Sequence, residues 1–185
     1  MGETQEKKQF DEIKKYALSN FDIQKILPHI NIFTYPHLEN VRHIDEVLDK
    51  HGRAIMLYLT DDDKTGHWVA LLKQGDEIEV FDPYGIKPDH QGKVLGGAMN
   101  EGASKYQTLL TDLIKQSGYG MKYNKTRHQP MSKNVSTCGR HAVLRILTGH
   151  LPLEEYNRRL KQIASDTGVS IDDIATGLTA GIVGE

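Results

Sequence analysis

One segment, residues 134–147 (NVSTCGRHAVLRIL), limits what the chain can fold into, and it holds the only cysteine. An apolar run covering most of a helix circumference is typical of a helix buried at a domain centre; here it comprises Ala142, Val143, Leu144, Ile146 and Leu147. Ser136 and Thr137 are good N-cap types. A cap at Thr137 puts Cys138 in the first turn, where free N–H groups and the helix dipole favour a thiolate. Gly139 beside it would let a substrate backbone come close.

The length of 185 residues fits a single domain with a real core. We expect N-terminal helices over 1–52, a catalytic sheet and the nucleophile helix over 53–150, and C-terminal helices over 151–185. The net charge of −2 gives no general attraction to nucleic acid. No apolar run approaches a membrane span, and the N-terminus lacks a signal-peptide core, so we expect no membrane association. A single cysteine excludes an internal disulfide and favours a reducing compartment.

Periodicity and turn residues predict the order of elements. Helices are expected at 3–18, from Ser19 or Asn20 to Pro28, and at 38–50, 104–116, 153–165 and after a cap at Ser170. Strands are expected at 31–35, 53–60, 67–73 and 77–82, with a basic edge strand at 119–127. An acidic turn is expected at 61–64 and a long loop at 83–102, a length that is usually functional or mobile.

A cysteine nucleophile needs a base, usually an imidazole, and the imidazole needs an orienting partner. His67 opens a buried strand directly after a glycine turn, and Asp82 ends the neighbouring strand. A two-residue hairpin loop, 74–75 or 75–76, would place Asp82 opposite His67 or diagonal to it, on the same face of the sheet. A three-residue loop without a bulge would place them on opposite faces.

The oxyanion of an acyl intermediate also needs hydrogen-bond donors. The backbone N–H groups of Cys138 and Gly139 can serve, and the amide of Gln129 is a further candidate. Gln129 lies nine residues before Cys138, so the loop between them has to bulge.

These residues, in this order, resemble those of the adenain-like and SUMO-protease-like cysteine peptidases (clan CE type): Gly66-His67-Trp68-Val69, Phe81-Asp82-Pro83-Tyr84-Gly85, Gln129 and Cys138-Gly139. The resemblance covers about residues 53–148. The second piece is especially similar to the adenovirus-type maturation proteases. The small size resembles the proteases of DNA viruses and virophages that cut capsid precursors.

The resemblance implies an α+β, adenain-like (papain-like) cysteine protease fold. In it, a central mixed or antiparallel sheet is flanked by helices, and the nucleophile lies at the N-terminus of a buried helix. His67, Asp82 and Cys138 would be catalytic, with Gln129, Cys138 and Gly139 at the oxyanion and Trp68 in support. The implied activity is an endopeptidase that matures virions by cutting capsid or other structural precursors at small-residue or glycine sites.

The same resemblance bears on cofactors and partners. We expect no cofactor and no metal. With no second cysteine, the disulfide-linked peptide cofactor of the adenovirus enzyme cannot be carried over, and on an acidic chain DNA is not expected as a partner. The protein partner would be a capsid precursor, and we expect a monomer in the virion and the host cytoplasm at the virus factory. A non-viral chain would be cytoplasmic.

Simpler explanations exist for each residue taken alone. Cys138 would be a small buried hydrophobe, His67 a strand-end histidine, Asp82 a turn opener, Gln129 a solvated loop residue and Trp68 a core residue. His141 makes a Cys-x-x-His zinc fragment with Cys138, but no other close ligand pair completes it. The basic stretch from Lys115 to Lys133 is explained by a solvated edge strand. Gly96-Gly97 is explained by a loop.

Three rival functions stay open. A ubiquitin or SUMO deconjugating protease acting on host proteins would use the same site. An acetyltransferase uses a related Cys-His-acid site. A non-enzymatic capsid-binding module would lack a reactive thiol.

Overall fold

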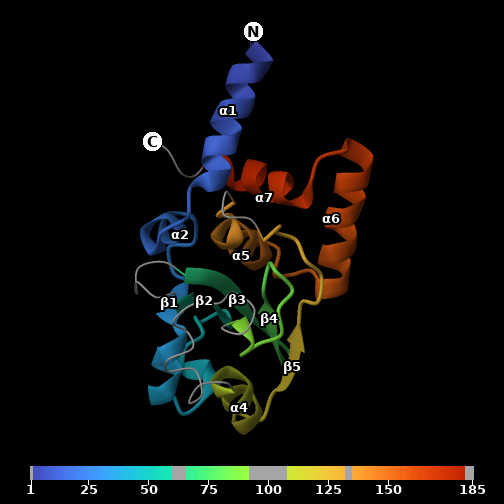
Figure 1. The fold of residues 1–185 in the computed structure, drawn as a ribbon. Helices are drawn as coiled ribbons and strands as arrows, with labels where there is room; N and C mark the ends of the chain where they lie inside the picture. The colour runs from blue at the N-terminus through green and yellow to red at the C-terminus, as the bar shows by residue number, and fades with distance from the viewer. Residues whose placement is uncertain (1, 60–65, 92–107, 132–134, 182–185) are drawn as a thin grey trace.

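The structure, a computed structural model, describes residues 2–59, 66–91, 108–131 and 135–181 and has an α+β fold. A five-stranded mixed sheet is covered by helices on both faces (Figure 1). The strands lie side by side in chain order: β1 (Asn31–Thr34), β2 (Arg53–Leu59), β3 (Gly66–Gln74), β4 (Glu77–Phe81) and β5 (Gly120–Tyr123). The central pairs β2–β3 and β3–β4 are antiparallel, whereas β1 and β5 run parallel to their neighbours.

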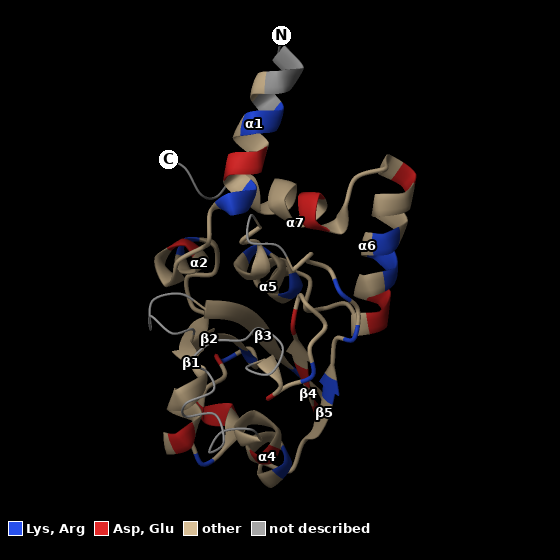
Figure 2. Ribbon diagram, in the orientation of Figure 1, with Lys and Arg blue, Asp and Glu red and all other residues tan. Residues whose placement is uncertain are grey.

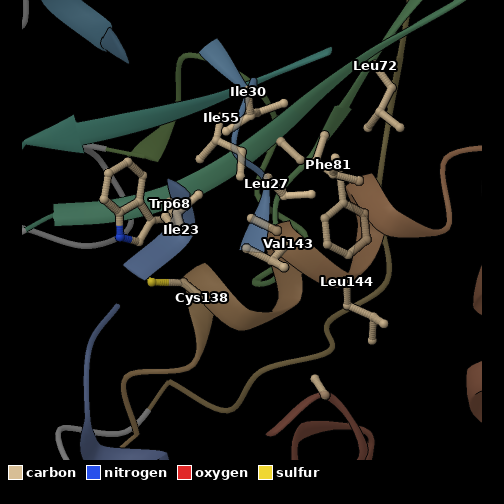
Figure 3. Close-up of a cluster of buried hydrophobic side chains, with 14 of the residues drawn as sticks. Ile23, Leu27, Ile30, Ile55, Trp68, Leu72, Phe81, Cys138, Val143 and Leu144 are labelled. Atoms are coloured by element: carbon tan, nitrogen blue, oxygen red, sulfur yellow. The ribbon is translucent and has the colours of Figure 1, made fainter. Parts of the chain in front are cut away.

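Two hydrophobic cores form because the side chains of each central strand alternate between the two faces of the sheet. In β3, Trp68, Ala70 and Leu72 face α5 (Cys138–Leu147), together with Phe81 of β4 (Figure 3). The intervening Val69 and Leu71 lie in the second core, with α4 (Leu109–Gln116). β3 is therefore buried on both faces, as its apolar run predicts.

The remaining helices pack mainly on the α5 side. They are α1 (Gly2–Lys15), α2 (Asn20–Ile26), α6 (Leu153–Thr167) and α7 (Ile171–Ala180). Two predicted N-caps are confirmed: the hydroxyls of Ser19 and Ser170 accept from the N–H groups of Asp22 and Asp173. The N-terminal end of α1 projects away from the body (Figure 1), and charges of both signs occur along α1 and α6 (Figure 2).

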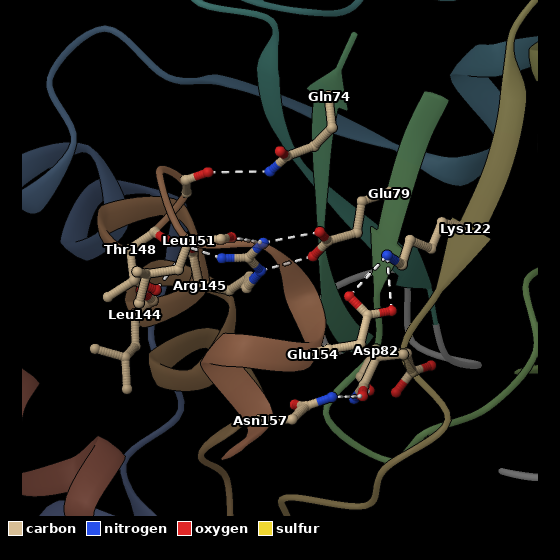
Figure 4. Close-up of polar contacts among 12 residues, drawn as sticks. Gln74, Glu79, Asp82, Lys122, Leu144, Arg145, Thr148, Leu151, Glu154 and Asn157 are labelled. Carbon is tan, nitrogen blue, oxygen red and sulfur yellow. Dashed lines mark hydrogen bonds and ion pairs between the residues drawn. The ribbon is translucent and has the colours of Figure 1, made fainter. Parts of the chain in front are cut away.

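The prediction of a buried central helix at residues 138–147 is confirmed, although polar side chains hold it as well as apolar ones. Arg145 is fully buried and binds Glu79 of β4 through two hydrogen bonds of 2.6 and 2.8 Å (Figure 4). Its guanidinium also donates to the carbonyls of Thr148 and Leu151. A buried ion pair needs such additional bonds to offset its desolvation. The pair ties the C-terminal half of α5 to the sheet.

The predicted helix at 38–50 is wrong. The chain instead forms two short 3₁₀ helices, Tyr35–Asn40 and Ile44–Glu46, separated by extended backbone at Val41 and His43. The Glu46 carboxylate accepts from the His43 N–H and starts the second turn, while the Ile44 N–H donates to Ser117 in the α4 region. Ile44, Val47 and Leu48 are still buried, so the apolar spacing identified core residues but not the helix type.

The edge strand predicted at 119–127 is also shorter than expected. β5 ends at Tyr123 because the Asn124 amide binds the backbone carbonyls of Asp82 and Thr126 and turns the chain. Lys122, from the basic stretch, pairs with Glu154 of α6 (Figure 4). The predicted helix at 104–116 is described only from Leu109, and the turn at 61–64, the glycines at 96–97 and most of the 83–102 loop lie outside the described residues.

Candidate active site

His67 and Asp82 lie on the same face of the sheet, as a two-residue hairpin loop at 75–76 predicts. Gln74 pairs with Glu77, so Asp82 is diagonal to His67 across β3 and β4. The His67 Nε2 lies 2.8 Å from the Asp82 Oδ1, and the two side chains are 4% and 1% exposed. Trp68 points to the opposite face, into the core, and its indole N–H donates to the Leu18 carbonyl. The pairing geometry is confirmed, whereas the catalytic roles stay predictions.

The imidazole of His67 interacts with the charges of both Asp82 and Cys138. Burial lowers the pKa of His67, but the charge and hydrogen bond of Asp82, followed by the hydrogen bond and charge of Cys138, raise it to about 10. A histidine in this setting keeps its proton at neutral pH. The arrangement therefore favours an imidazolium between a carboxylate and a sulfur.

Tyr84, two residues after Asp82, covers the imidazole. Its ring stacks on His67 with centroids 4.5 Å apart and planes 17° apart, and its backbone N–H donates to the Asp82 Oδ1 over 2.7 Å. Burial, and then the charges of Cys138, Asp82 and Asp172, raise the pKa of Tyr84 to about 12. The neutral phenol ring shields the imidazole without adding charge.

Cys138 is the first residue of α5, as predicted, and is 8% exposed. First-turn N–H groups have no acceptor within their own helix, and none of the described residues accepts from the N–H of Cys138 or Gly139. Thr137 precedes the helix, but its hydroxyl donates to Asp172 rather than capping α5. The two free N–H groups beside the sulfur fit an oxyanion site.

The expected reason for a glycine at 139 needs correction. A Cβ at this position would lie 3.1 Å from the Leu18 Cβ and 3.1 Å from the Trp68 Cδ1. The missing side chain thus allows α5 to pack closely on Leu18 and Trp68. It makes room for the core, where we expected room for a substrate backbone.

Gln129 is buried in the loop before α5. The N–H groups of His128 and Gln129 both donate to the Pro83 carbonyl, which ties this loop to the residue after Asp82. The side-chain amide donates to the Val135 carbonyl over 3.3 Å, and its oxygen has no partner among the described residues. Its part in an oxyanion site stays a prediction, and residues 132–134 of the loop lie outside the description.

Gln91 is a site residue that sequence reasoning missed. It is fully buried, and its amide nitrogen donates to the Asp82 Oδ2 over 2.8 Å. It lies in the long segment after Pro83 that we expected to be a loop. No local signal could have identified it, because a solvated glutamine and a buried one look alike in a loop sequence.

A second buried histidine–aspartate pair involves His141, three residues after Cys138 in α5. The His141 Nε2 is 3.0 Å from the Asp172 Oδ1 of α7, and the same oxygen accepts from the Thr137 hydroxyl. The Lys14 ammonium of α1 lies 3.4 Å from the Asp172 Oδ2. Asp172 was expected only as a first-turn acid of the last helix, so this contact was missed.

Across the described ranges, no group of three or more His, Cys, Asp or Glu side chains is placed to hold a metal ion. His141, the zinc candidate, instead pairs with Asp172. No helix in the same ranges is long and apolar enough to cross a membrane.

Comparison with known proteins relates the chain to a virophage protein. No family model matches the chain. The central domain of the uncharacterized Lpg1148 protein from Legionella pneumophila aligns with a TM-score of 0.39 and 17% identity over 90% of this chain and 99% of that one. The uncharacterized protein V9 of Sputnik virophage is 33% identical over 174 residues, which span 93% of this chain and 99% of V9. The chain therefore belongs to the same family as the Sputnik virophage protein V9.

Proposed function

We propose that this protein is a cysteine endopeptidase with an adenain-like, papain-like fold that processes viral structural precursors. The observation that carries the proposal is the placement of His67, which lies between the Asp82 carboxylate and the sulfur of Cys138 at a helix N-terminus. A nucleophile, a base and an orienting acid in contact are the constellation that acyl transfer needs. The ordered resemblance of His67-Trp68, Asp82-Pro83, Gln129 and Cys138-Gly139 to the SUMO-protease-like peptidases supports the same reaction.

The reaction begins with Cys138 as thiolate and His67 as imidazolium. The sulfur attacks the scissile carbonyl carbon, and the N–H groups of Cys138 and Gly139 hold the resulting oxyanion, with Gln129 as a third donor once it releases Val135. His67 then gives its proton to the leaving amine as the C–N bond breaks, which leaves a thioester on Cys138. A water molecule, deprotonated by His67, attacks the thioester and releases the carboxylate product and the thiolate.

Asp82 keeps the imidazole oriented through both steps. It accepts from Nε2, so Nδ1 is left to face the sulfur. This carboxylate also stabilises the positive ring that each step regenerates.

The proposed substrate is a capsid or other virion precursor, cut at small-residue or glycine sites. The virophage relative supports a viral source, and the narrow exposure of Cys138 favours small side chains next to the scissile bond. The protein would act as a monomer at the virus factory and in the virion.

The test is cleavage of the purified major capsid precursor of the same virus, with the products identified by mass spectrometry. Wild type should cut it at defined sites, and Cys138→Ala should lower the rate by at least about a thousandfold while the protein stays folded. His51→Ala, at an exposed turn before β2, is the matched control for His67→Ala. Activity of Cys138→Ala above about a thousandth of that of wild type would overturn the assignment of Cys138 as nucleophile.

The same preparation separates the rival substrates. Release of C-terminal extensions from ubiquitin or SUMO, without cleavage of the capsid precursor, would indicate a deconjugating protease that uses the same proposed active site on a different substrate. Labelling of Cys138 by acetyl-CoA without peptide cleavage would indicate an acetyltransferase.

A further inference from the structure

The Asp82 side chain is held by three donors, one from β3 and two from the segment after Pro83. Its Oδ1 accepts from the His67 ring and from the Tyr84 N–H, and its Oδ2 accepts from the Gln91 amide over 2.8 Å. A carboxylate can turn about its last side-chain torsion, because that torsion is broad. With His67 and Tyr84 both on Oδ1, the Gln91 bond is the one that holds the second oxygen.

Gln91 is an unfavourable residue for the stability of the fold. It is fully buried, and its side-chain oxygen has no partner among the described residues. A buried polar atom without a partner lowers stability, whereas an apolar side chain of the same shape would avoid that loss. The benefit of the amide therefore lies at the other end, on the Asp82 carboxylate.

We propose that Gln91 is a positioning residue that fixes the Asp82 carboxylate so that its Oδ1 stays directed at the His67 imidazole. This inference rests on the proposed function. Without the amide, Oδ2 is buried and unpaired, and the carboxylate rotates to find another donor. The His67 ring then loses part of the support that keeps it charged beside Cys138.

The experiment measures the rate of Cys138 alkylation by iodoacetamide against pH, read by intact-protein mass. Because the chain has one cysteine, all the signal comes from Cys138. Gln91→Met, which keeps the shape and removes the donor, should move the profile to higher pH by roughly one unit, the usual effect of losing a hydrogen bond to a charged group. Gln74→Met is the matched control, because its amide donates to the Gly149 carbonyl at the other end of β3 and should leave the profile in place.

A double-mutant cycle tests whether Gln91 acts through Asp82. In an Asp82→Ala background, Gln91→Met should cause no further shift. A shift of the same size in both backgrounds, or a Gln91→Met profile that matches wild type, would overturn the inference. If Gln91→Met does not fold, Gln91→Asn takes its place: its amide is one methylene too short to reach Asp82, so a shift in the same direction is expected.

The His67→Ala variant separates the two ways of failing. If His67→Ala moves the alkylation profile and Gln91→Met does not, the proposed active site stands and only the role of Gln91 is wrong. If neither changes a profile that already matches a free thiol, the resting ion pair of the proposed function is wrong, and the inference falls with it.

Discussion

Two buried histidine–aspartate pairs flank the start of α5, and only one of them reaches the sulfur. In both, a ring Nε2 contacts a carboxylate Oδ1, at 2.8 Å for His67–Asp82 and 3.0 Å for His141–Asp172. Cys138 also helps to raise the pKa of His67, whose ring stacks under Tyr84. His141 lies one turn further along the Cys138 helix, and its Nδ1 has no partner among the described residues.

The two carboxylates differ in what else they hold. Asp82 accepts from the Gln91 amide, inside the proposed catalytic group. Asp172 accepts from the Thr137 hydroxyl and lies beside the Lys14 ammonium, so it joins α7 and α1 to the residue before Cys138. The backbone N–H of Ser136 donates to the Lys14 carbonyl and strengthens the same connection.

A buried histidine–aspartate contact does not by itself mark a catalytic base, because structural pairs form the same bond. One hairpin, β3–β4, brings the first pair together, whereas the packing of α7 on α5 brings the second pair together. We infer that the first pair supplies charge to the sulfur and that the second holds the helix that carries the sulfur.

The largest expected difference in cleavage rate is between His67→Ala and His141→Ala. His67→Ala should lower capsid-precursor cleavage by at least about a thousandfold, because the base and nucleophile act as a unit. His141→Ala should lower cleavage by less than about a hundredfold, through a small displacement of Cys138. It should also lower the free energy of unfolding by about 1 to 3 kcal/mol, because the buried Asp172 carboxylate loses one of its hydrogen-bond partners.

Cleavage rates and urea unfolding measured on both variants check this comparison. A stable but fully inactive His141→Ala, beside an active His67→Ala, would exchange the roles of the two histidines.

Substitutions of the two aspartates should differ in the same way: those of Asp82 should mainly lower the cleavage rate, and that of Asp172 should mainly lower stability. The effects on the cleavage rate should be smaller than for the histidines. Asp82→Asn should cause a partial loss of cleavage and Asp82→Ala a larger one, both smaller than the loss in Cys138→Ala. Asp172→Ala should mainly destabilise, by about 2 to 4 kcal/mol, because the Thr137 hydroxyl and the His141 ring lose their acceptor. Steady-state cleavage rates and thermal unfolding, measured on each variant, check this prediction. A wild-type cleavage rate in Asp82→Ala would mean that Asp82 has only a structural role in the turn.

The two pairs should lose their contributions to folding stability at opposite ends of the pH scale. Folding raises the pKa of His67 from 6.5 to about 10, so its contribution to stability is complete below about pH 6.5 and is lost as the pH rises through about 10. Burial raises the pKa of Asp172, but the hydrogen bonds from His141 and Thr137 and the charges of His141 and Lys14 outweigh this effect, so the pKa lies below its ordinary value. Its contribution is therefore present above the ordinary value of 3.8 and is lost as the pH falls through the lower folded value.

Urea unfolding across the pH range measures both effects. His67→Ala should flatten the alkaline decline seen in wild type, and Asp172→Asn should flatten part of the acid decline. An alkaline decline that is the same in wild type and His67→Ala would contradict a charged His67 in the folded protein.

The smallest expected effect is that of Lys14→Met. Its ammonium lies at the rim of the Asp172 pair and is partly exposed, where an ion pair contributes about 1 kcal/mol or less. Thermal unfolding should shift slightly and cleavage should not change. A loss of cleavage in this variant would mean that α1 takes a direct part in the site, which would blur the division between the two pairs.

Several features of the site are predictable because they depend on neighbouring residues. The sequence predicts the hairpin but leaves its loop at two or three residues; the structure has a two-residue loop at 75–76, and this register puts Asp82 beside His67. The apolar run after Cys138 predicts its place at the start of a buried helix. The helix expected at 38–50 was wrong because its apolar spacing also fits two 3₁₀ turns, and a contact from Ser117 helps to decide between them.

By itself, the sequence determined the sheet hairpin, the buried helix and the position of Cys138 on it, since each follows from the periodicity and caps of one continuous segment. Only the tertiary structure decided that Gln91 holds Asp82, that Asp172 takes the Thr137 hydroxyl, and that Gly139 makes room for Trp68. The physical reason is that these contacts join segments whose separation along the chain carries no periodic signal. A buried amide or carboxylate becomes distinct from a solvated one only when packing removes its water.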